Sequence, residues 1–565
     1  MPDFVHDAYS PLDYKATVFG GEGRPGVKSW VPLDHARRLA AYRVLGAYGD
    51  NIARHFLPQG LTEEQRAKYR EYGHADRLIV GARSALMGDE QSIHVPTAEP
   101  VDVQDGQEQP EEVQRGQQAL DLLNQWALDE RLWLQMLEAE HDCAKLGDSV
   151  WTLYWDEEKK RPRLVTYDPG FYFPAPAEGA GNDFARRQHI AWEEMAADGT
   201  TPELHVLSWS LEQIRPASEI GPDGSVNYLH NDDGTPVPQP GDSLDEDGVL
   251  VRTYPWNPTP SRLTCLYTEA IYDLSRLRGD VFDLHGNARY LQRDLDLRLD
   301  YIPVVHIPNT PARRNGFGRS ILTIVAQLLD DLSGNDTDLA ESGALVGNAT
   351  LVTKGGPAGA LDAGPGRHLD LPLDGSAEYL DVSKNLDALL KQKSNLQKDL
   401  TVNTRLSDAI LGRLDASNAV SGIGLALSFS PTSELRRETL GVRDEKYPLL
   451  LKMVLRMYQA ANVLPAGPTP AAQILFGSFL PSDMTQAVTL AGAAVKAGVM
   501  STETAVLYLQ EKGFPIDDAV AEVERIRREN FAAALQLVET TGNIADAYRF
   551  LGLAPATTTP PEPTA

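Results

Sequence analysis

The chain has 565 residues, a formal net charge of −28, 42% hydrophobic residues and 23% charged residues. This length exceeds what one hydrophobic core holds, so we expect several domains or one elongated subunit. The acidic balance excludes a surface that wraps nucleic acid tightly, because such binding neutralises phosphates with Lys and Arg.

The two cysteines, Cys143 and Cys265, do not form a CxxC pair. This excludes cysteine zinc cages and disulfide frameworks, and it favours a reducing compartment. The opening MPDFVHDAYS has neither a basic nor an apolar signal region, so we expect no signal peptide. No run approaches the ~18 apolar residues of a membrane span, so we expect no membrane partner.

Residues 1–316 combine helical and strand patterns. Apolar residues recur every three or four positions over 34–86 and 117–147, which predicts helices there. Two apolar, β-rich runs around a charged turn predict a hairpin over 149–169. Alternation over 293–307 predicts one strand.

Three further stretches lack such periodicity. Acidic, Pro-bearing and turn-forming residues predict connecting loops at 97–117 and 216–262. The Pro/Thr-rich tail at 551–565 is predicted to be disordered.

The pattern after residue 319 is mainly helical. Long helices are predicted at 320–343 and 383–411, with Ser320 as the N-cap of the first. A Gly-rich, β-like piece at 344–382 lies between them.

A third long helix is predicted at 430–463, and Pro448 inside it predicts a kink. A strand at 472–482 precedes three capped helical patterns within 483–550. Together these patterns predict an α+β fold that is mainly helical.

Residues 412–429, GRLDASNAVSGIGLALSF, separate two of the long helices with small residues. Gly412, Gly422 and Gly424 make this segment pliable. A hinge, a ligand-gripping loop and a plain connector all fit the pattern.

The sequence has no GxxxxGK[ST], HExxH, GxSxG or EF-hand motif. GFGRS at 316–320 lacks the lysine of a phosphate loop and is interpreted as a turn with a helix cap. The oxygen-rich 330–342 has Asp336 where a calcium loop needs Gly, and is interpreted as a solvated helix face. We therefore predict no catalytic residues, no metal site and no cofactor, and we do not expect an enzyme.

Basic residues recur every seven positions in the second long helix, at Lys384, Lys391, Lys398 and Arg405. Seven residues are close to two helical turns, so the four share one slowly drifting face. This stripe could face a polyanion, pair with a neighbouring subunit, or be a solvated face with local pairs. Asp387, four positions before Lys391, has the spacing of a helical salt bridge.

The order of these parts resembles the portal proteins of tailed bacteriophages, the head-to-tail connectors of siphophages. The resemblance covers roughly residues 35–550. It rests on the long helix at 383–411, the helix with Pro448 and these stretches: LGDSVWTLYWD with RPRLVTYDPGFYF, IPVVHIPNTPARRNGFGRSILTIVAQLLDDL, NAVSGIGLAL, ILFGSFLPSDMTQAVTLAGAAVKAGVMSTETAVLYL and EVERIRREN.

The resemblance implies an elongated subunit with parts called wing, stem, clip and crown. Placed on this sequence, they are a wing at 1–316 to which the strand at 472–482 returns, stem helices at 320–343 and 383–411, a clip at 344–382 and a crown at 483–550.

The resemblance also implies that 412–429 is a tunnel loop near passing DNA, with Arg413, Asn418, Ser421, Gly422 and Gly424 as its polar and flexible members. The implied partners are other copies in a ring, usually of twelve, double-stranded DNA, the large terminase subunit, a head–tail adaptor, and the major capsid and scaffolding proteins. The implied location is the virion, with assembly in the host cytoplasm.

Two other functions remain open. The chain could be a capsid-associated adaptor without a channel, or an unrecognised hydrolase. A ring with an axial hole would distinguish the portal from both.

Overall fold

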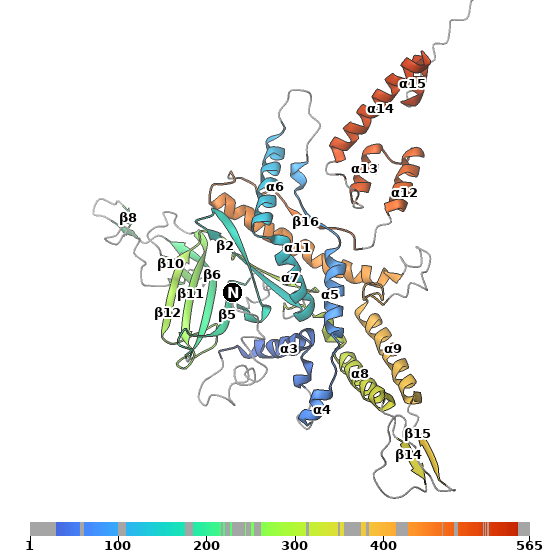
Figure 1. The fold of residues 1–565 in the computed structure, drawn as a ribbon. Coiled ribbons are helices and arrows are strands. Elements are labelled where there is room, and N and C mark those ends of the chain that lie inside the picture. Colours follow the sequence, from blue (N-terminus) through green and yellow to red (C-terminus); the bar gives the residue numbers. More distant parts are fainter. Residues whose placement is uncertain are drawn as a thin grey trace, which may run out of the picture. The chain divides into compact units, whose positions relative to one another are not determined.

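Figure 1 shows the computed structural model of the chain. It describes residues 30–56, 62–99, 109–175, 185–199, 201–215, 218–220, 226–228, 243–244, 250–253, 262–311, 316–347, 351–354, 375–379, 383–413, 428–465, 467–479, 484–511, 514, 516 and 519–551. The fold is mixed α+β, mainly helical, with several antiparallel sheets, as the sequence predicts.

The chain divides into two compact units, residues 1–87 with 91–475 and residues 88–90 with 476–565. The helices of the first part of the first unit are α3 (Leu33–Gly49), η1 (Ala53–Phe56), α4 (Glu63–Lys68), α5 (His74–Met87), η2 (Pro96–Ala98), α6 (Glu111–Asp129) and α7 (Leu132–Leu146).

Two expectations for this part are wrong. The single helix predicted at 117–147 is two helices, because Arg131 adopts a left-handed conformation with φ 53° between α6 and α7. The loop predicted at 97–117 ends early, since α6 already begins at Glu111. Gly147, with φ 108°, ends α7 in the left-handed conformation that glycine tolerates best.

The predicted hairpin supplies two strands of a three-stranded sheet, in which β2 is central and β3 lies at one edge. β2 (Asp148–Asp156) pairs antiparallel with β3 (Arg161–Tyr167) and with β13 (Val304–Pro308). Every residue of β13 is buried, and so are the first six of β2. This sheet is the core of the first unit.

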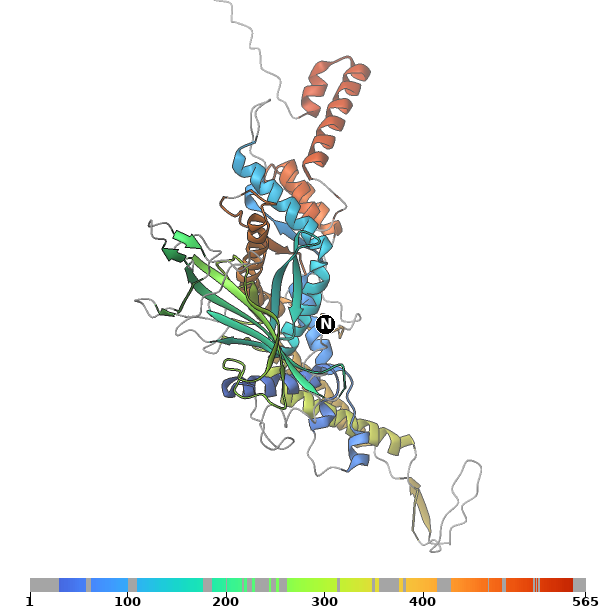
Figure 2. The same cartoon turned by 90° about the vertical axis from the view of Figure 1, so that its left-hand side faces the viewer.

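A larger sheet of seven strands lies beside this core (Figure 2). Its strands are β4 (Tyr172–Ala175), β5 (Arg187–Met195), β6 (Pro202–Arg215), β9 (Ser243–Leu244), β10 (Leu250–Thr253), β11 (Arg262–Asp273) and β12 (Ala288–Asp296). β10 runs parallel to β6, and the other pairs are antiparallel. Part of the loop predicted at 216–262 is thus strand, including the small hairpin of β7 (Ser218–Ile220) and β8 (Val226–Tyr228).

The single strand predicted at 293–307 is also wrong. It is the end of β12 and the whole of β13, separated by an irregular segment. Asp294 and Arg298 adopt positive φ values of 47° and 57°, which break the alternation. Leu295 is 45% exposed while Leu299 is buried, so the two do not share one buried face.

The middle of the chain forms a helical pair with a hairpin after its first helix. η5 (Ile321–Ile324) leads into α8 (Ala326–Gly347), and α8 packs against α9 (Ser383–Thr404). Between them, β14 (Leu351–Lys354) pairs antiparallel with β15 (Ser376–Tyr379). The helix predicted at 383–411 therefore ends seven residues early, at Thr404.

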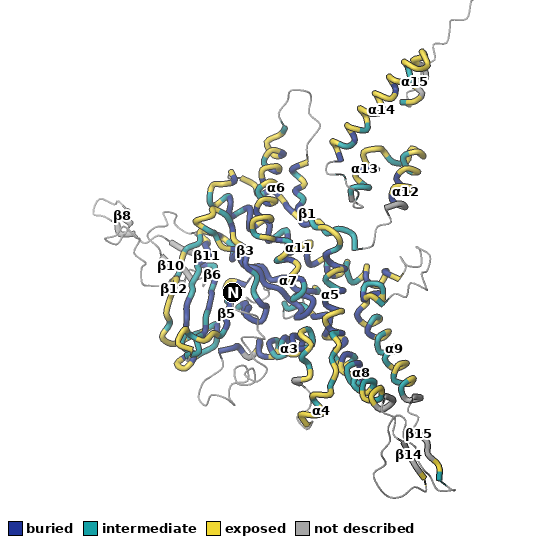
Figure 3. Tube along the Cα trace, viewed as in Figure 1, coloured by how far each residue is buried: buried dark blue, intermediate teal, exposed yellow. Residues whose placement is uncertain are grey.

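α11 (Ser430–Ala460) packs against β13, β3 and α5, with Pro448 inside it. Figure 3 shows the most buried stretches where α7, β2 and α11 meet. There the ring of Trp151 meets that of Tyr447 edge-on at 5.9 Å. The kink predicted at Pro448 stays a prediction.

A charged cluster lies within this apolar core. The guanidinium of fully buried Arg443 donates to the carboxylate of Glu140 at 2.6 Å and to the carbonyl of Asn309 at 2.7 Å. The hydroxyl of Tyr447 donates to the same carboxylate at 2.6 Å. Because buried charges cost energy unless paired, this cluster fixes how α11, α7 and the end of β13 fit together.

β16 (Gln473–Phe476) is shorter than the strand predicted at 472–482, and it pairs with β1 (Gln91–His94) in the N-terminal part of the chain. The second unit is helical. Its helices are α12 (Met484–Lys496), α13 (Thr502–Glu511), α14 (Ala519–Thr541) and α15 (Ile544–Phe550). Val506, Ala519 and Val523 form a small buried core there.

Candidate functional site

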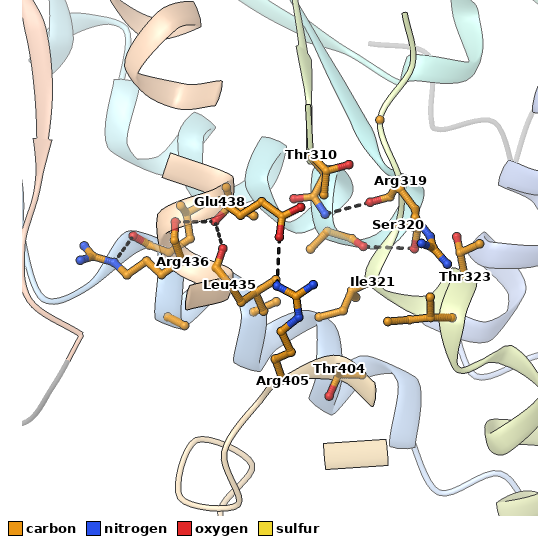
Figure 4. Close-up of a pocket in the computed structure, with 18 of the residues that line it drawn as sticks. Thr310, Arg319, Ser320, Ile321, Thr323, Thr404, Arg405, Leu435, Arg436 and Glu438 are labelled. Atoms are coloured by element: carbon orange, nitrogen blue, oxygen red, sulfur yellow. Dashed lines mark hydrogen bonds and ion pairs between the residues drawn. The ribbon is translucent and has the colours of Figure 1, made fainter. Parts of the chain in front are cut away.

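A cavity of about 600 Å³ lies within the first unit. Figure 4 shows part of its lining, which comes from α5, α7, the 309–324 segment, the turn after α9 and the first turns of α11. Six charged side chains line it, namely Arg83, Glu140, Arg319, Arg405, Arg436 and Glu438. Four of the six are arginines, in a chain with an excess of acidic residues.

Arg405 lies where α9 ends. It adopts φ 59°, which stops the helix, and its carbonyl accepts a hydrogen bond from the hydroxyl of Thr432 at 2.9 Å. The same Thr432 oxygen accepts from the amide of Ser407 at 2.9 Å. The turn after α9 is thus anchored to the start of α11, and the Arg405 guanidinium reaches Glu438 at 3.0 Å (Figure 4).

The predicted basic stripe is therefore shorter than the sequence suggests. Lys391 and Lys398 are exposed on α9, and neither has an acidic partner in the described part of the chain. The salt bridge considered between Asp387 and Lys391 does not form among the described residues. Arg405 does not extend the face of these lysines, because it lies outside α9 and pairs with Glu438. The side chain of Lys384 lies outside the described residues.

The predicted tunnel loop is described only at its ends. Its first residue, Gly412, has φ 67°, and Arg413 donates to the carbonyl of Gln397 at 3.1 Å. The predicted loop residues Asn418, Ser421, Gly422 and Gly424 lie outside the described residues. Arg413 thus bonds to α9 rather than extending away from it.

A buried polar junction joins α8 to α9 and α5. The carboxylate of Asp336 lies 2.8 Å from Nε2 of His74 and 2.6 Å from Nζ of Lys393. Burial alone would raise the pKa of Asp336, but the hydrogen bonds from His74 and Lys393 outweigh it, and the pKa lies below its ordinary value. The solvated face predicted at 330–342 is therefore wrong here, since Asp336 and Asn335 are both buried.

The GFGRS segment is a turn and a cap, as interpreted from the sequence. The amide of Gly318 donates to the carboxylate of Asp148 at 2.7 Å. The hydroxyl of Ser320 accepts from the amide of Leu322 and donates to the carbonyl of Lys145 at 2.6 Å. The Gly318 amide and Ser320 hydroxyl are thus already used within the protein.

Within the described ranges, no group of three or more His, Cys, Asp or Glu side chains is arranged to hold a metal ion. Over the same residues, no helix is long and apolar enough to cross a membrane. The described residues present positive charge at two places, the two exposed lysines on α9 and the cavity lined by arginines.

No protein family and no curated protein matches this sequence. Among solved structures, the chain is similar to one in the neck of an empty gene transfer agent particle with C6 symmetry. The TM-score is 0.37 and the identity 12%, over 88% of this chain and 98% of that one. A chain from the virion of a native gene transfer agent particle gives a TM-score of 0.34 and 12% identity, with the same coverage. Scores below 0.5 do not establish a common fold.

Proposed function

We propose that this protein is a portal subunit of a phage-like particle. In this proposal about twelve copies form a closed ring at one capsid vertex, as in the family that the sequence resembles. Double-stranded DNA passes through the axial channel during packaging and ejection. The role is structural, and the protein is located in the virion.

The observation that carries the proposal is the open surface of α9. Of its described side chains between residues 386 and 399, none is buried, while Leu390 is 50% exposed and Val402 is 75% exposed. Within the chain, α9 packs against α8 and buries Leu400 and Thr404 near its C-terminal end. In this proposal the exposed face before them packs against other chains. A ring supplies such neighbours to every copy at once.

The charges of α9 fit a channel that conducts DNA without holding it. Each phosphate contact adds affinity by releasing a counterion, so many cations would act as a brake. Lys391 and Lys398 would give sparse basic rings in an otherwise acidic protein, and the duplex could slide while staying centred.

The proposal assigns parts to the described elements. α8 and α9 form the stem, β14 and β15 belong to the clip, and α12 to α15 form the crown. The clip would meet the large terminase subunit, which supplies the energy of packaging, and later the head–tail adaptor. The wing would face the major capsid and scaffolding proteins.

A capsid-associated adaptor without a channel is the second candidate, because the open α9 surface would also suit it. Native mass spectrometry with negative-stain imaging of the purified protein separates the two. A closed ring of about twelve subunits with a central hole is expected for a portal. Another stoichiometry, or a solid assembly, would favour the adaptor. An assembly-incompetent monomer with a ligand-filled pocket would favour the hydrolase instead.

A further inference from the structure

Two of the arginines that line the cavity have no partner for their guanidinium groups in the described part of the chain. Arg83, on α5, is half-buried, and its Nε is buried without a hydrogen bond. Arg319 follows Gly318 and is exposed. The other two arginines are engaged, because Arg405 pairs with Glu438 and Arg436 donates to the carbonyl of Leu86.

The acidic groups of the cavity do not compensate these two charges. Glu140 is fully buried and neutralised by Arg443 at 2.6 Å. Glu438 is neutralised by Arg405 at 3.0 Å. The lining therefore keeps the uncompensated positive charge of Arg83 and Arg319. A concave site with two guanidinium groups that are unpaired among the described residues, one of them half-buried, favours an anion that can accept from their N–H donors.

The size of the cavity selects among anions. Duplex DNA carries its phosphates on a convex surface, spaced about 1.7 Å apart along the axis, and a cavity of about 600 Å³ does not admit it. The carboxylate of a Glu or Asp side chain enters such a space with a few neighbouring residues. Hydroxyl groups of Thr310 and Thr323 also line the cavity and can bond to peptide groups.

The most abundant source of carboxylates is a second copy of the chain, which has 80 acidic and 52 basic residues. We propose that the Arg83–Arg319 cavity receives an Asp- or Glu-bearing segment of a neighbouring copy. This inference rests on the proposed ring, since only an assembly holds the copies side by side. Each cavity is then filled by the next subunit, and the contact is electrostatic and sensitive to salt.

A cross-linking experiment tests the occupant. Arg319→Lys keeps the positive charge and adds an amine that carbodiimide can join to a carboxylate. Rings are assembled from equal amounts of ¹⁴N- and ¹⁵N-labelled protein, cross-linked and analysed by mass spectrometry. We expect a mixed-isotope peptide that links position 319 to an Asp or Glu. Arg437→Lys, an exposed position on α11 outside the cavity, is the control and should not give that peptide. A link within one isotope only, or no link at position 319, overturns the inference.

Charge reversal supplies an independent measurement. In Arg83→Glu/Arg319→Glu, the protein concentration for half-assembly at moderate salt should rise roughly tenfold or more. Arg437→Glu, alone or combined with the same change at a second exposed arginine, should leave the half-assembly concentration within about twofold. Circular dichroism of the unassembled chain checks that both variants fold.

The outcomes separate this inference from the proposed function. If the unchanged protein forms no ring, the proposed function fails and the inference falls with it. If the unchanged protein forms a ring and the charge-reversed variant forms the same ring at the same salt, only the inference fails. If a short DNA duplex abolishes the position-319 cross-link while the ring stays intact, phosphate is the occupant and the inference is overturned.

Discussion

The guanidinium of Arg443 lies 2.6 Å from the carboxylate of Glu140, a residue 303 positions earlier in the chain, and neither side chain is exposed. Burial opposes the charge of Arg443, but the carboxylate of Glu140 outweighs that effect and raises the arginine pKa. The arginine therefore keeps its charge although it is buried. The pair joins α7 to α11 at the centre of the first unit.

Removing one member of this pair should destabilise the first unit strongly. Arg443→Met leaves the Glu140 carboxylate buried without its cation, which costs about 3–5 kcal/mol. All eight tryptophans lie in this unit, so fluorescence during urea unfolding measures its stability alone. The double variant Glu140→Leu/Arg443→Met should recover most of the loss. Lys160→Met, which breaks an exposed pair with Glu157, should cost less than about 1 kcal/mol. Equal losses in the two single variants would contradict the role of burial.

Gly318→Ala should destabilise the same unit because the segment before η5 approaches two other parts of the chain. A Cβ atom at Gly318 would lie 2.2 Å from the carbonyl oxygen of Gly147 and 2.6 Å from the amide of Asn309. Both neighbours are backbone, so we expect a loss of about 3 kcal/mol in the free energy of unfolding. Gly441→Ala in α11 is the matched control, since a Cβ there meets nothing within 4 Å. It should be neutral or stabilising by up to about 1 kcal/mol. Similar effects at the two positions would disprove the steric argument.

Asp142 should make stability depend on pH in the direction opposite to an ordinary carboxylate. Burial, followed by the negative charge of Asp168, raises its pKa to about 7. The folded chain therefore holds a proton that the unfolded chain releases near pH 4, and stability falls as the pH rises from about 4 to about 7. Asp142→Asn should be more stable than the unchanged protein at pH 8, by on the order of 2 kcal/mol. The difference should vanish at pH 4.

Urea unfolding at the two pH values measures this effect. Asp121→Asn, at an exposed position of α6, is the control for the same chemical change. A gain from Asp142→Asn that is equal at pH 4 and pH 8 would show that packing, rather than proton binding, is responsible.

Lys391→Glu/Lys398→Glu should reduce DNA packaging if α9 faces the proposed channel. The change replaces two exposed cations with anions that repel the phosphates. We expect roughly tenfold fewer DNA-filled particles, counted by quantitative PCR of nuclease-resistant genomes. Lys159→Glu/Lys160→Glu, in the exposed turn between β2 and β3, makes the same change of charge away from α9 and should package normally. Normal packaging by the α9 variant, with intact rings, would remove the channel role of these lysines.

Local patterns predicted the elements whose boundaries local residues determine. The hairpin of β2 and β3 and the end of α7 at Gly147 follow from turn and cap residues within a few positions. The break at Arg131 and the end of α9 before Arg405 have no such signal, since both residues are ordinary helix formers held at positive φ by the fold. Thr432, which anchors the second of these turns, lies 27 positions further along the chain.

The charge environment was predictable only in part. The seven-residue spacing predicted that Lys391 and Lys398 share one face of a helix, but it did not predict that this face is exposed. The buried state of Asp336 was not, because its partner His74 is 262 positions away and nothing near it in the sequence marks it as buried. The arginine-lined cavity was missed for the same reason. Its members come from segments that are far apart in sequence, and no spacing rule connects Arg83 with Arg319.

The pairing of β1 with β16 constrains how the protein is made. β1 leaves the ribosome about 380 residues before β16, and at about 5–20 residues per second it waits about 20–80 s for its partner. During that time Ile93, which is buried in the finished fold, has nothing to cover it from the other strand. Release of incomplete chains would therefore leave a strand edge open to aggregation, and chaperone demand should be greatest for products that stop before residue 473.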